Sequence, residues 1–253
     1  MRNRVKLPVG LPPKVWHGLV NAMDYGIPQN RVRFILFGIK RDLLRDGEKV
    51  DLERHLSRYK RDTPTVRDAI SDLPVVRNGS SCVGTDYHPA NVEYVQQMRK
   101  FMLNGDLHDH FTPNHAEYVI ERFKKISQGD NWKSICDDMK NYKSVDKTHS
   151  NIYRRLVYDL PAHTISHYRK SMTIHPTQSR GLSMREACRL QSFPDWFRFY
   201  GKLDNQQQHL ANAVPPMLAR AIANAIADFW IRSSTLGLPQ KTCQAQWNFV
   251  RGK

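Results

Sequence analysis

Three polar side chains near the start of the sequence have the residue types and spacing to hold a nucleotide: Gln29, Arg31 and Arg33. Gln29 precedes the run RVRFILFGI at 31–39, and both arginines lie within it. This run is rich in β-branched and aromatic residues and predicts a short buried strand. Residues two apart on a strand share a face, so the two arginines would project together. A guanidinium group fits both a phosphate and the acceptor edge of a base. The same pattern also fits arginines on a solvated rim at the end of a strand.

A second group of informative residues lies in GLSMREACRLQSFP, 181–194. Ser183, with Glu186 three residues later, has the pattern of a capping box, which predicts a helix that starts there and is stopped by Pro194. Because this cap explains Glu186, we expect it and Arg185 to organise structure rather than to react. Cys188 lies inside the same helix and is expected to pack as a small apolar side chain rather than to act as a nucleophile.

The overall composition favours a polyanionic partner. The 253 residues include 39 Lys and Arg against 24 Asp and Glu, a net charge of +15. Nucleic acid is the partner that such a surplus suggests first, and an inert basic surface is the alternative. No apolar run approaches the roughly 20 residues that span a bilayer, and the basic N-terminus has no apolar core of a secretory signal. The four cysteines form no C-x-x-C pair, so we expect free thiols in a reducing cytoplasm.

Apolar spacing and helix-end residues predict the elements that must position these side chains. The predicted elements are a short helix in TVRDAISDLP (65–74), a helix within 113–128, short strands at AHTIS (162–166) and SMTIHP (171–176), and a helix that starts at Pro215 or Pro216 with an apolar stripe from Val214 to Phe229. Between about 75 and 160 the sequence is polar and rich in turn residues. A polar insert of this kind is typical of a recognition region carried on a scaffold.

Three stretches, in order, resemble motifs of the DNA cytosine-C5 methyltransferases. LVNAMDYGIPQNRVRFILFGIKRDL (19–43) resembles their eighth motif, with its Q-x-R-x-R signature. GLSMREACRLQSFPDWFRFYG (181–201) resembles the ninth, and LANAVPPMLARAIANAI (210–226) resembles the tenth. The resemblance covers about 19–228, with a variable segment between the eighth and ninth motifs as in that family. Two positions depart from the pattern: Ala211 stands in place of Gly and Ser183 in place of Thr.

The resemblance implies a role for several residues. Gln29, Arg31 and Arg33 would lie at the edge of the catalytic pocket, where the arginines would grip a flipped cytosine and its phosphate. A second set would close the pocket for the cofactor S-adenosylmethionine: Asn212, Ala213 and Val214. The segment from about 75 to 163 would choose the sequence of the double-stranded DNA partner. Thr164 and Arg185 are the further residues expected at the DNA.

The sequence lacks three other motifs of that family. Its members attack cytosine with a Cys in Pro-Cys-Gln, steady the base with a Glu in Glu-Asn-Val and hold the cofactor with F-x-G-x-G, and none of these occurs here. Without a thiolate to add at C6, cytosine C5 does not accept a methyl group. We therefore expect the C-terminal half of such an enzyme, inactive alone, with a second chain supplying the missing motifs. A non-catalytic DNA-binding or regulatory protein and a truncated remnant are the alternatives.

The expected fold class is α/β: a partial, Rossmann-like S-adenosylmethionine-dependent methyltransferase core plus a small irregular α+β target-recognition domain. The expected boundaries are 1–72 for the core with the eighth motif, 73–200 for target recognition with the ninth motif, 201–235 for the tenth motif returning to the core, and 236–253 for a tail. If a sheet is missing, its docking site should be an exposed apolar edge near residues 5–40. A cytoplasmic location at the nucleoid is implied.

The stretch HDHFTPNH also raises a metal hypothesis, through His108, Asp109, His110 and His115. No Cys or His cluster at zinc spacing accompanies these residues. We therefore expect a polar recognition loop and no metal.

Overall fold

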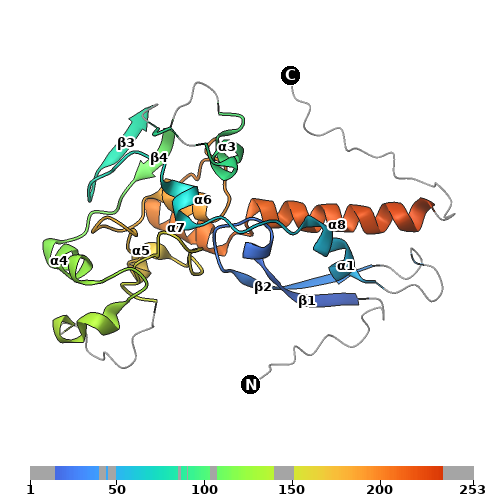
Figure 1. Cartoon of the computed structure of the whole chain (residues 1–253), viewed down its shortest axis with the longest axis horizontal. Helices are drawn as coiled ribbons and strands as arrows, with labels where there is room; N and C mark the ends of the chain where they lie inside the picture. Colours follow the sequence, from blue (N-terminus) through green and yellow to red (C-terminus); the bar gives the residue numbers. More distant parts are fainter. Residues whose placement is uncertain are drawn as a thin grey trace. The chain divides into compact units, whose positions relative to one another are not determined.

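The computed structural model describes residues 15–39, 44, 50–84, 87–89, 91–102, 107–139 and 151–235 (Figure 1). Its elements are β1 (Val15–Asn21), η1 (Ala22–Asp24), β2 (Val32–Gly38), α1 (Leu52–Leu56), η3 (Ser57–Tyr59), α2 (Val66–Ile70), β3 (Ser81–Gly84), α3 (Glu93–Arg99), β4 (Leu107–Phe111), α4 (Glu117–Lys125), η4 (Trp132–Asp138), α5 (Tyr168–Ser171), α6 (Met184–Leu190), α7 (Leu203–Asn212) and α8 (Pro216–Thr235). Within these ranges β1 pairs with β2 and β3 with β4, so the α/β class is confirmed at this coarse level. In the same ranges we find no helix long and apolar enough to cross a membrane. The expected tail and Cys243 lie outside the described residues.

The chain folds as two compact units, and each is assembled from separate stretches of sequence. The first comprises Met1–Val20, Phe34–Tyr59 and Arg220–Lys253, and the second comprises Asn21–Arg33 and Lys60–Ala219. In the first unit, Phe229 of α8 lies with its ring edge toward Phe37 of β2, with ring centroids 6.2 Å apart. This contact belongs to a small apolar cluster that also includes Ile39, Leu44, Val50 and Trp230.

The predicted strand at 31–39 forms as β2, but the prediction that it is buried was wrong. Phe34 is 48% exposed and Leu36 is 44% exposed, while the residues between them are partly covered. On the paired strand β1, Leu19 is 75% exposed. The rings of His17 and Phe34 lie 5.8 Å apart, which places the two exposed rows on one face. We call His17, Leu19, Phe34 and Leu36 the apolar sheet face.

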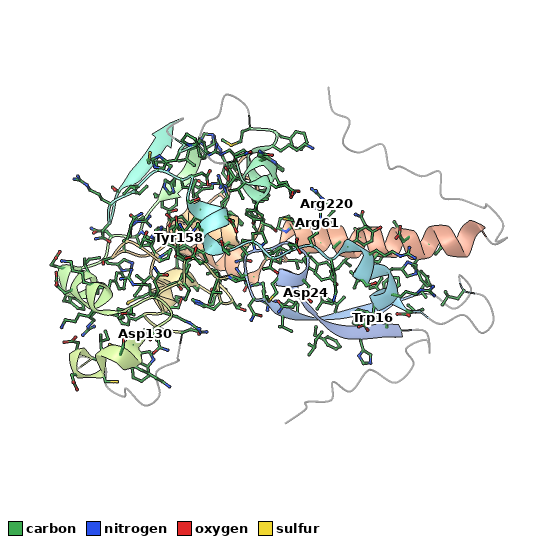
Figure 2. All side chains as sticks on the ribbon, in the orientation of Figure 1. Trp16, Asp24, Arg61, Asp130, Tyr158 and Arg220 are labelled. Carbon is green, nitrogen blue, oxygen red and sulfur yellow. The ribbon has the colours of Figure 1, made fainter. Side chains whose placement is uncertain are left out.

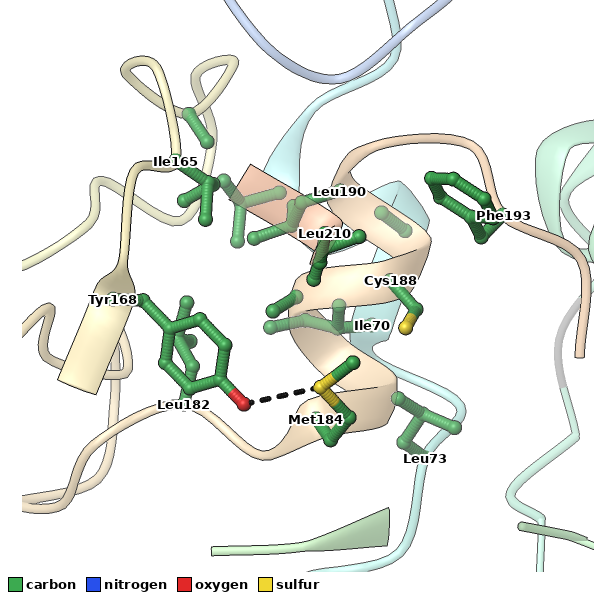
Figure 3. Close-up of a cluster of buried hydrophobic side chains, with 14 of the residues drawn as sticks. Ile70, Leu73, Ile165, Tyr168, Leu182, Met184, Cys188, Leu190, Phe193 and Leu210 are labelled. Carbon is green, nitrogen blue, oxygen red and sulfur yellow. Dashed lines mark hydrogen bonds between the residues drawn. The ribbon is translucent and has the colours of Figure 1, made fainter. Parts of the chain in front are cut away.

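The core of the second unit is built around α6, every residue of which is buried. Leu182, Met184 and Leu190 pack against α2 and α7 in a cluster that includes Ile70, Ile165 and Leu210 (Figure 3). The Tyr168 hydroxyl donates to the sulfur of Met184 at 3.4 Å across this cluster. The capping box predicted at the start of this helix is present, and so are the predicted helices α2, α4 and α8, the last starting at Pro216.

A smaller core lies in the recognition segment, under α4 and η4. Arg155 holds it by closing the end of α4: its guanidinium donates to the carbonyl oxygens of Phe123 at 2.5 Å and Ile126 at 2.6 Å. The same group donates to the carbonyl oxygens of His175 and Gln178. A buried cation at a helix C-terminus satisfies carbonyl groups that the helix itself leaves unpaired.

Two strand predictions were wrong. At 162–166 only Ala162 forms a bridge, to Gln29, and at 171–176 only Ile174 forms bridges, to Arg155 and Gly181. The reason is that the backbone groups here bond to loops and turns rather than along a neighbouring strand. Ala162 bonds to Pro28 and Asn30, and Ile174 bonds to Arg154 and Leu156. The carbonyl oxygen of Ile165 accepts from the Arg31 guanidinium. The sequence analysis also missed α3, α7 and the antiparallel β3–β4 pair, in which Cys82 lies opposite His110.

Candidate functional site

Arg31 is the residue that draws the site together. Its side chain is 1% exposed, and its guanidinium donates to the carbonyl oxygens of Ile165 at 3.2 Å, Ala211 at 2.6 Å and Ala213 at 3.0 Å. We call this arrangement the Arg31 clamp. It joins the Q-x-R-x-R segment to the stretch that ends the recognition region and to the loop before α8. Burial, and next the positive charge of Arg33, lowers the pKa of Arg31 to about 10, so it remains a cation at neutral pH.

Gln29 and Thr164 strengthen the same junction. Gln29 is fully buried and donates from Nε2 to the carbonyl oxygen of Leu190 at 3.3 Å, at the end of α6. The Thr164 hydroxyl donates to the carbonyl oxygen of Asn30 at 2.7 Å. Backbone hydrogen bonds join Asn30 to Ala162, and Ala162 to Pro28, at 2.8 and 2.9 Å. The loop before β2 is therefore fixed by backbone and side chains alike.

Arg33 differs from Arg31 in its surroundings. It lies on β2, is partly exposed, and donates from Nη1 to the carbonyl oxygen of Val32 at 2.8 Å. Arg31 lies one residue before that strand and points to the clamp carbonyls. Because Arg33 has no carboxylate partner within the described residues, its charge is available to an anion.

The loop before α8 presents two exposed side chains. Asn212 is exposed and Val214 is 53% exposed, while Ala213 between them is partly covered and gives its carbonyl oxygen to the Arg31 clamp. Ala211, which replaces the glycine of the motif, falls in the last turn of α7 and is not among the described residues with positive φ. Alanine therefore costs nothing at this position. The loop offers the amide of Asn212 and the apolar surface of Val214 to a ligand.

The predicted capping pair lies in a buried ionic cluster. Ser183 and Glu186 cap α6 reciprocally, and the Glu186 carboxylate pairs with the Arg180 guanidinium at 2.7 Å. Burial alone would raise the pKa of Glu186, but Arg180 outweighs it and the pKa lies well below its ordinary value. Burial lowers the pKa of His175 to about 4, so this ring is neutral beside Glu186 at neutral pH. Glu186 thus serves structure, as expected.

Arg185 lies with its side chain fully buried on α6, away from solvent. It donates to the carbonyl oxygens of His108 at 2.9 Å, Pro194 at 3.1 Å and Phe197 at 3.0 Å. It also pairs with the carboxylates of Asp109 at 3.4 Å and Asp195 at 3.8 Å. Arg185 therefore fixes β4 and the stretch after α6, and its guanidinium has no open side.

A further buried arginine, Arg189, pairs with two buried carboxylates. Arg189 pairs with Asp72 at 2.8 Å and with Asp195 at 2.6 Å, and all three side chains are fully buried. Burial would lower the pKa of Arg189, yet the two carboxylates raise it above its ordinary value. The Asp72 carboxylate also contacts Arg99 of α3. This network ties α2, α3 and α6 together, and the sequence analysis did not find it because its members are far apart in sequence.

The residues of the metal hypothesis have other partners. His110 is buried between the Ser183 hydroxyl, 2.9 Å from Nδ1, and the carbonyl oxygen of Pro74, 2.8 Å from Nε2. Asp109 pairs with Arg185, and the His115 ring lies with its edge to Phe123, centroids 5.3 Å apart. No three His, Cys, Asp or Glu side chains gather for a metal ion in the part of the chain that the structure describes. Cys188 lies in the α6 core, where burial raises its thiol pKa to about 12, as expected for a packing residue.

A cavity of about 690 Å³ opens beside this site, between the start of α8 and α3. Gly26, Arg61, Glu93, Tyr94 and Met217 are among its lining residues, and Figure 2 labels Arg61. None of Gln29, Arg31, Arg33 and Asn212 lines it. The predicted site residues therefore lie outside this cavity.

The sequence and the fold match known proteins of one kind. The family described as C-5 cytosine-specific DNA methylase matches residues 14–228. Type II methyltransferase M.DdeI of Desulfomicrobium norvegicum is 32% identical over 83% of this chain and 53% of its own length. Type II methyltransferase M.Bpa9945I of Bacillus paralicheniformis is 31% identical over 83% of this chain and 50% of its own length. The chain thus spans about half the length of these relatives.

One solved structure shows the same fold. It is described as a DNA modification methyltransferase encoded within an E. coli prophage, and it superposes with a TM-score of 0.64. The match has 24% identity and covers 85% of this chain and 60% of the other.

Proposed function

Because this chain belongs to the C-5 cytosine-specific DNA methylase family, we propose that it is the DNA-recognising, target-positioning part of a cytosine-C5 methyltransferase. The observation that carries this proposal is the Arg31 clamp. One buried guanidinium joins the segment that resembles the eighth motif, at Arg31, to the segment that resembles the tenth, at Ala211 and Ala213, and to Ile165 near the end of the recognition segment. A protein that offered only a basic surface would not require these segments to be joined by a buried guanidinium.

Arg33 is the arginine that we propose for the DNA. It is partly exposed and has no carboxylate partner in the described ranges, so it can take the phosphate of the target nucleotide. Gln29 and Arg31 act one step back, by holding the loop that presents Arg33. Thr164 holds Asn30 of the same loop, and Arg185 acts on DNA through β4, whose backbone it fixes.

S-adenosylmethionine, which this family uses, supplies the methyl group. The loop before α8 fits a role at its pocket because Asn212 and Val214 are exposed while Arg31 fixes the carbonyl oxygens on either side of Asn212. We propose that Asn212 hydrogen-bonds to the cofactor and that Ala213 and Val214 contact its apolar parts. The Arg31 clamp would hold this loop at a fixed position relative to the loop before Arg33.

The segment 73–200 is proposed to select the DNA sequence, with 1–72 and 201–235 belonging to the catalytic core. Two of its buried arginines, Arg155 under α4 and Arg185 behind β4, bond to backbone carbonyl oxygens. Such internal fixing leaves the loops around them to contact bases and phosphates.

The nucleophile must come from elsewhere, because no cysteine in the sequence follows a proline. We propose that a second polypeptide segment with Pro-Cys-Gln, Glu-Asn-Val and F-x-G-x-G covers the apolar sheet face. Leu19, Phe34 and Leu36 expose apolar side chains on one side of two strands, and a two-stranded sheet needs further strands or helices to be stable. The relatives, about twice as long, have the length for such a segment. The missing motif equally favours a second candidate, a non-catalytic DNA-binding protein.

The test is transfer of labelled methyl from S-adenosylmethionine to DNA, with this chain alone and with the product of the adjacent upstream reading frame. Activity in the mixture alone supports the proposal, and activity of the chain alone contradicts the need for a second segment. In the mixture, Phe34→Asp should abolish activity by blocking the covered face, whereas Val75→Asp, at a side chain that is 70% exposed in another unit, should not. If the mixture transfers no methyl group but the chain still binds DNA, the result supports a non-catalytic DNA-binding protein.

A further inference from the structure

A surface with alternating aromatic and basic side chains follows α6. In the stretch Trp196–Tyr200, Phe197 and Phe199 point inward and pack on Phe193, with ring centroids 5.1 Å apart in each pair. The residues between them face outward: Trp196 is 51% exposed, Tyr200 is 79% exposed, and Arg198 is exposed. The inner row anchors the stretch, so the outer row is held in a fixed arrangement.

The C-terminal end of α3 adjoins this stretch. The Asp195 amide donates to the carbonyl oxygen of Met98 at 2.8 Å, so the exposed residues Lys100 and Trp196 start from neighbouring backbone. Phe101 is 74% exposed, and the Lys100 ammonium lies 5.2 Å from its ring centroid. We call Lys100, Phe101, Trp196, Arg198 and Tyr200 the aromatic–basic surface.

Phe101 has a backbone φ of 71°, in the left-handed region. A bulky side chain rarely adopts this conformation because its Cβ crowds the backbone. Here the strained backbone holds a large apolar ring in water, which packing does not explain. Strain of this kind is a pointer to a function when it is observed at an exposed position.

Charge decides what the aromatic–basic surface can bind. The carboxylate of Asp195 is buried and paired with Arg189, and that of Asp204 pairs with the His167 ring at 3.1 Å. Arg198 donates to the His108 ring and keeps other N–H groups for a ligand. Exposed cations beside exposed rings suit a nucleic-acid strand, because cations take phosphates and rings stack on bases or pack on sugars.

We propose that the aromatic–basic surface is a nucleic-acid contact separate from the Arg31 clamp. Arg198 and Lys100 would hold phosphates, while Trp196, Tyr200 and Phe101 would cover unpaired bases or the sugars of a duplex. This surface lies within the segment 73–200 and involves neither Arg33 nor the loop at Asn212–Val214, so the inference rests on the proposed function and deepens it by naming a surface for the contact. It would lengthen the footprint of the protein on its substrate.

The test is equilibrium binding of the full chain to a labelled oligothymidylate and to a labelled duplex, by fluorescence anisotropy at two salt concentrations. The first variant is Trp196→Ala/Tyr200→Ala, which should weaken binding about tenfold, since each stacked ring contributes substantially. The second is Lys100→Gln/Arg198→Gln, which removes the two cations of the surface. Its matched control is Arg54→Gln/Lys60→Gln, which removes the same charge from exposed residues elsewhere. Circular dichroism confirms that each variant is folded.

Loss of oligothymidylate binding would assign the surface to unpaired bases, and loss of duplex binding alone would assign it to the DNA backbone. The proposal is overturned if the aromatic variant binds both probes like the wild type, or if the two charge variants lose equal affinity. The measurement needs no methyl transfer. A silent methylation assay with binding lost in the aromatic variant would therefore separate this inference from the proposed function.

Discussion

Replacement of Arg189 by methionine tests the buried network that holds α2, α3 and α6. Methionine keeps the length of the side chain and removes the cation, leaving Asp72 and Asp195 without their shared partner. Both carboxylates are fully buried, and each accepts from Arg189 within 3.0 Å. Breaking a buried ion pair costs about 3–5 kcal/mol because an uncompensated charge remains in the interior. A folded domain has only about 5–15 kcal/mol in total, so Arg189→Met should be severely destabilised.

The assay is urea unfolding followed by circular dichroism, with thermal unfolding as a second measure. At about 2–4 °C per kcal/mol, the expected loss in melting temperature is about 6–20 °C. Asp72→Asn completes a double-mutant cycle, because the asparagine relieves one stranded charge in the Arg189→Met background. The double variant should be more stable than the sum of the single losses predicts, by about 1–3 kcal/mol.

The matched control is Arg67→Met. Arg67 makes two hydrogen bonds to Asp159, at 2.5 and 3.0 Å, and its guanidinium lies 4.3 Å from the Tyr158 ring centroid. Its pair with Asp159 has similar geometry, but both side chains are more than half exposed, 52% and 68%. Exposed pairs contribute little because water screens them. If Arg189→Met shifts the urea midpoint no more than Arg67→Met, the argument from burial is refuted.

Three further predictions follow from single contacts. Ser183→Ala should cost about 1 kcal/mol in urea unfolding, because it removes the α6 cap and the partner of His110, and Ser183→Thr should restore most of it. Burial lowers the pKa of His175 to about 4, so the folded protein resists protonation of this ring. The ring therefore contributes stability above about pH 6.5 that is lost as the pH falls toward 4. His175→Asn should show a smaller drop in urea midpoint than the wild type from about pH 7 to about pH 5, and an equal drop would refute this. With its thiol pKa raised to about 12, Cys188 should be alkylated only after unfolding, as peptide mapping would show; labelling in the native protein would contradict its burial.

Local sequence signals predicted the elements whose determinants are close together in the chain. The box formed by Ser183 and Glu186 needs only four residues, and it appears as expected at the start of α6. The same is true of α2, whose cap is Thr65 with Asp68, and of the α8 start at Pro216. The starts of α2 and α6 are set by hydrogen bonds between the cap side chains and the helix's own backbone, so the local sequence is sufficient to find them. The start of α8 follows from the fixed backbone angle of proline, which suits a first helical turn.

Long-range partners decided the features that sequence patterns did not predict. The run 162–166 has the residue types of a strand, but within it the carbonyl oxygen of Ile165 accepts from Arg31, 134 residues away. The run 31–39 reads as a buried strand because its residues are apolar. Its exposed half shows that apolar composition does not state what covers a face. The partners of Arg189 lie 117 residues before it and 6 after it, a spacing that no local rule predicts.

Three buried arginines bond several backbone carbonyl oxygens each, and this role distinguishes Arg31 from Arg33 in the Q-x-R-x-R pattern. Arg31, Arg155 and Arg185 each direct a planar set of N–H groups to several backbone carbonyl oxygens. A guanidinium can join three loops in this way without a regular sheet because its five N–H groups spread over a rigid plane, whereas the three N–H groups of lysine radiate from one nitrogen. In a region with little strand pairing, these side-chain hydrogen bonds hold the backbone in place of the hydrogen bonds between strands of a sheet. Arg33 has the same side chain but no such set of carbonyls, so its guanidinium keeps the capacity for a phosphate that Arg31 has given to the fold.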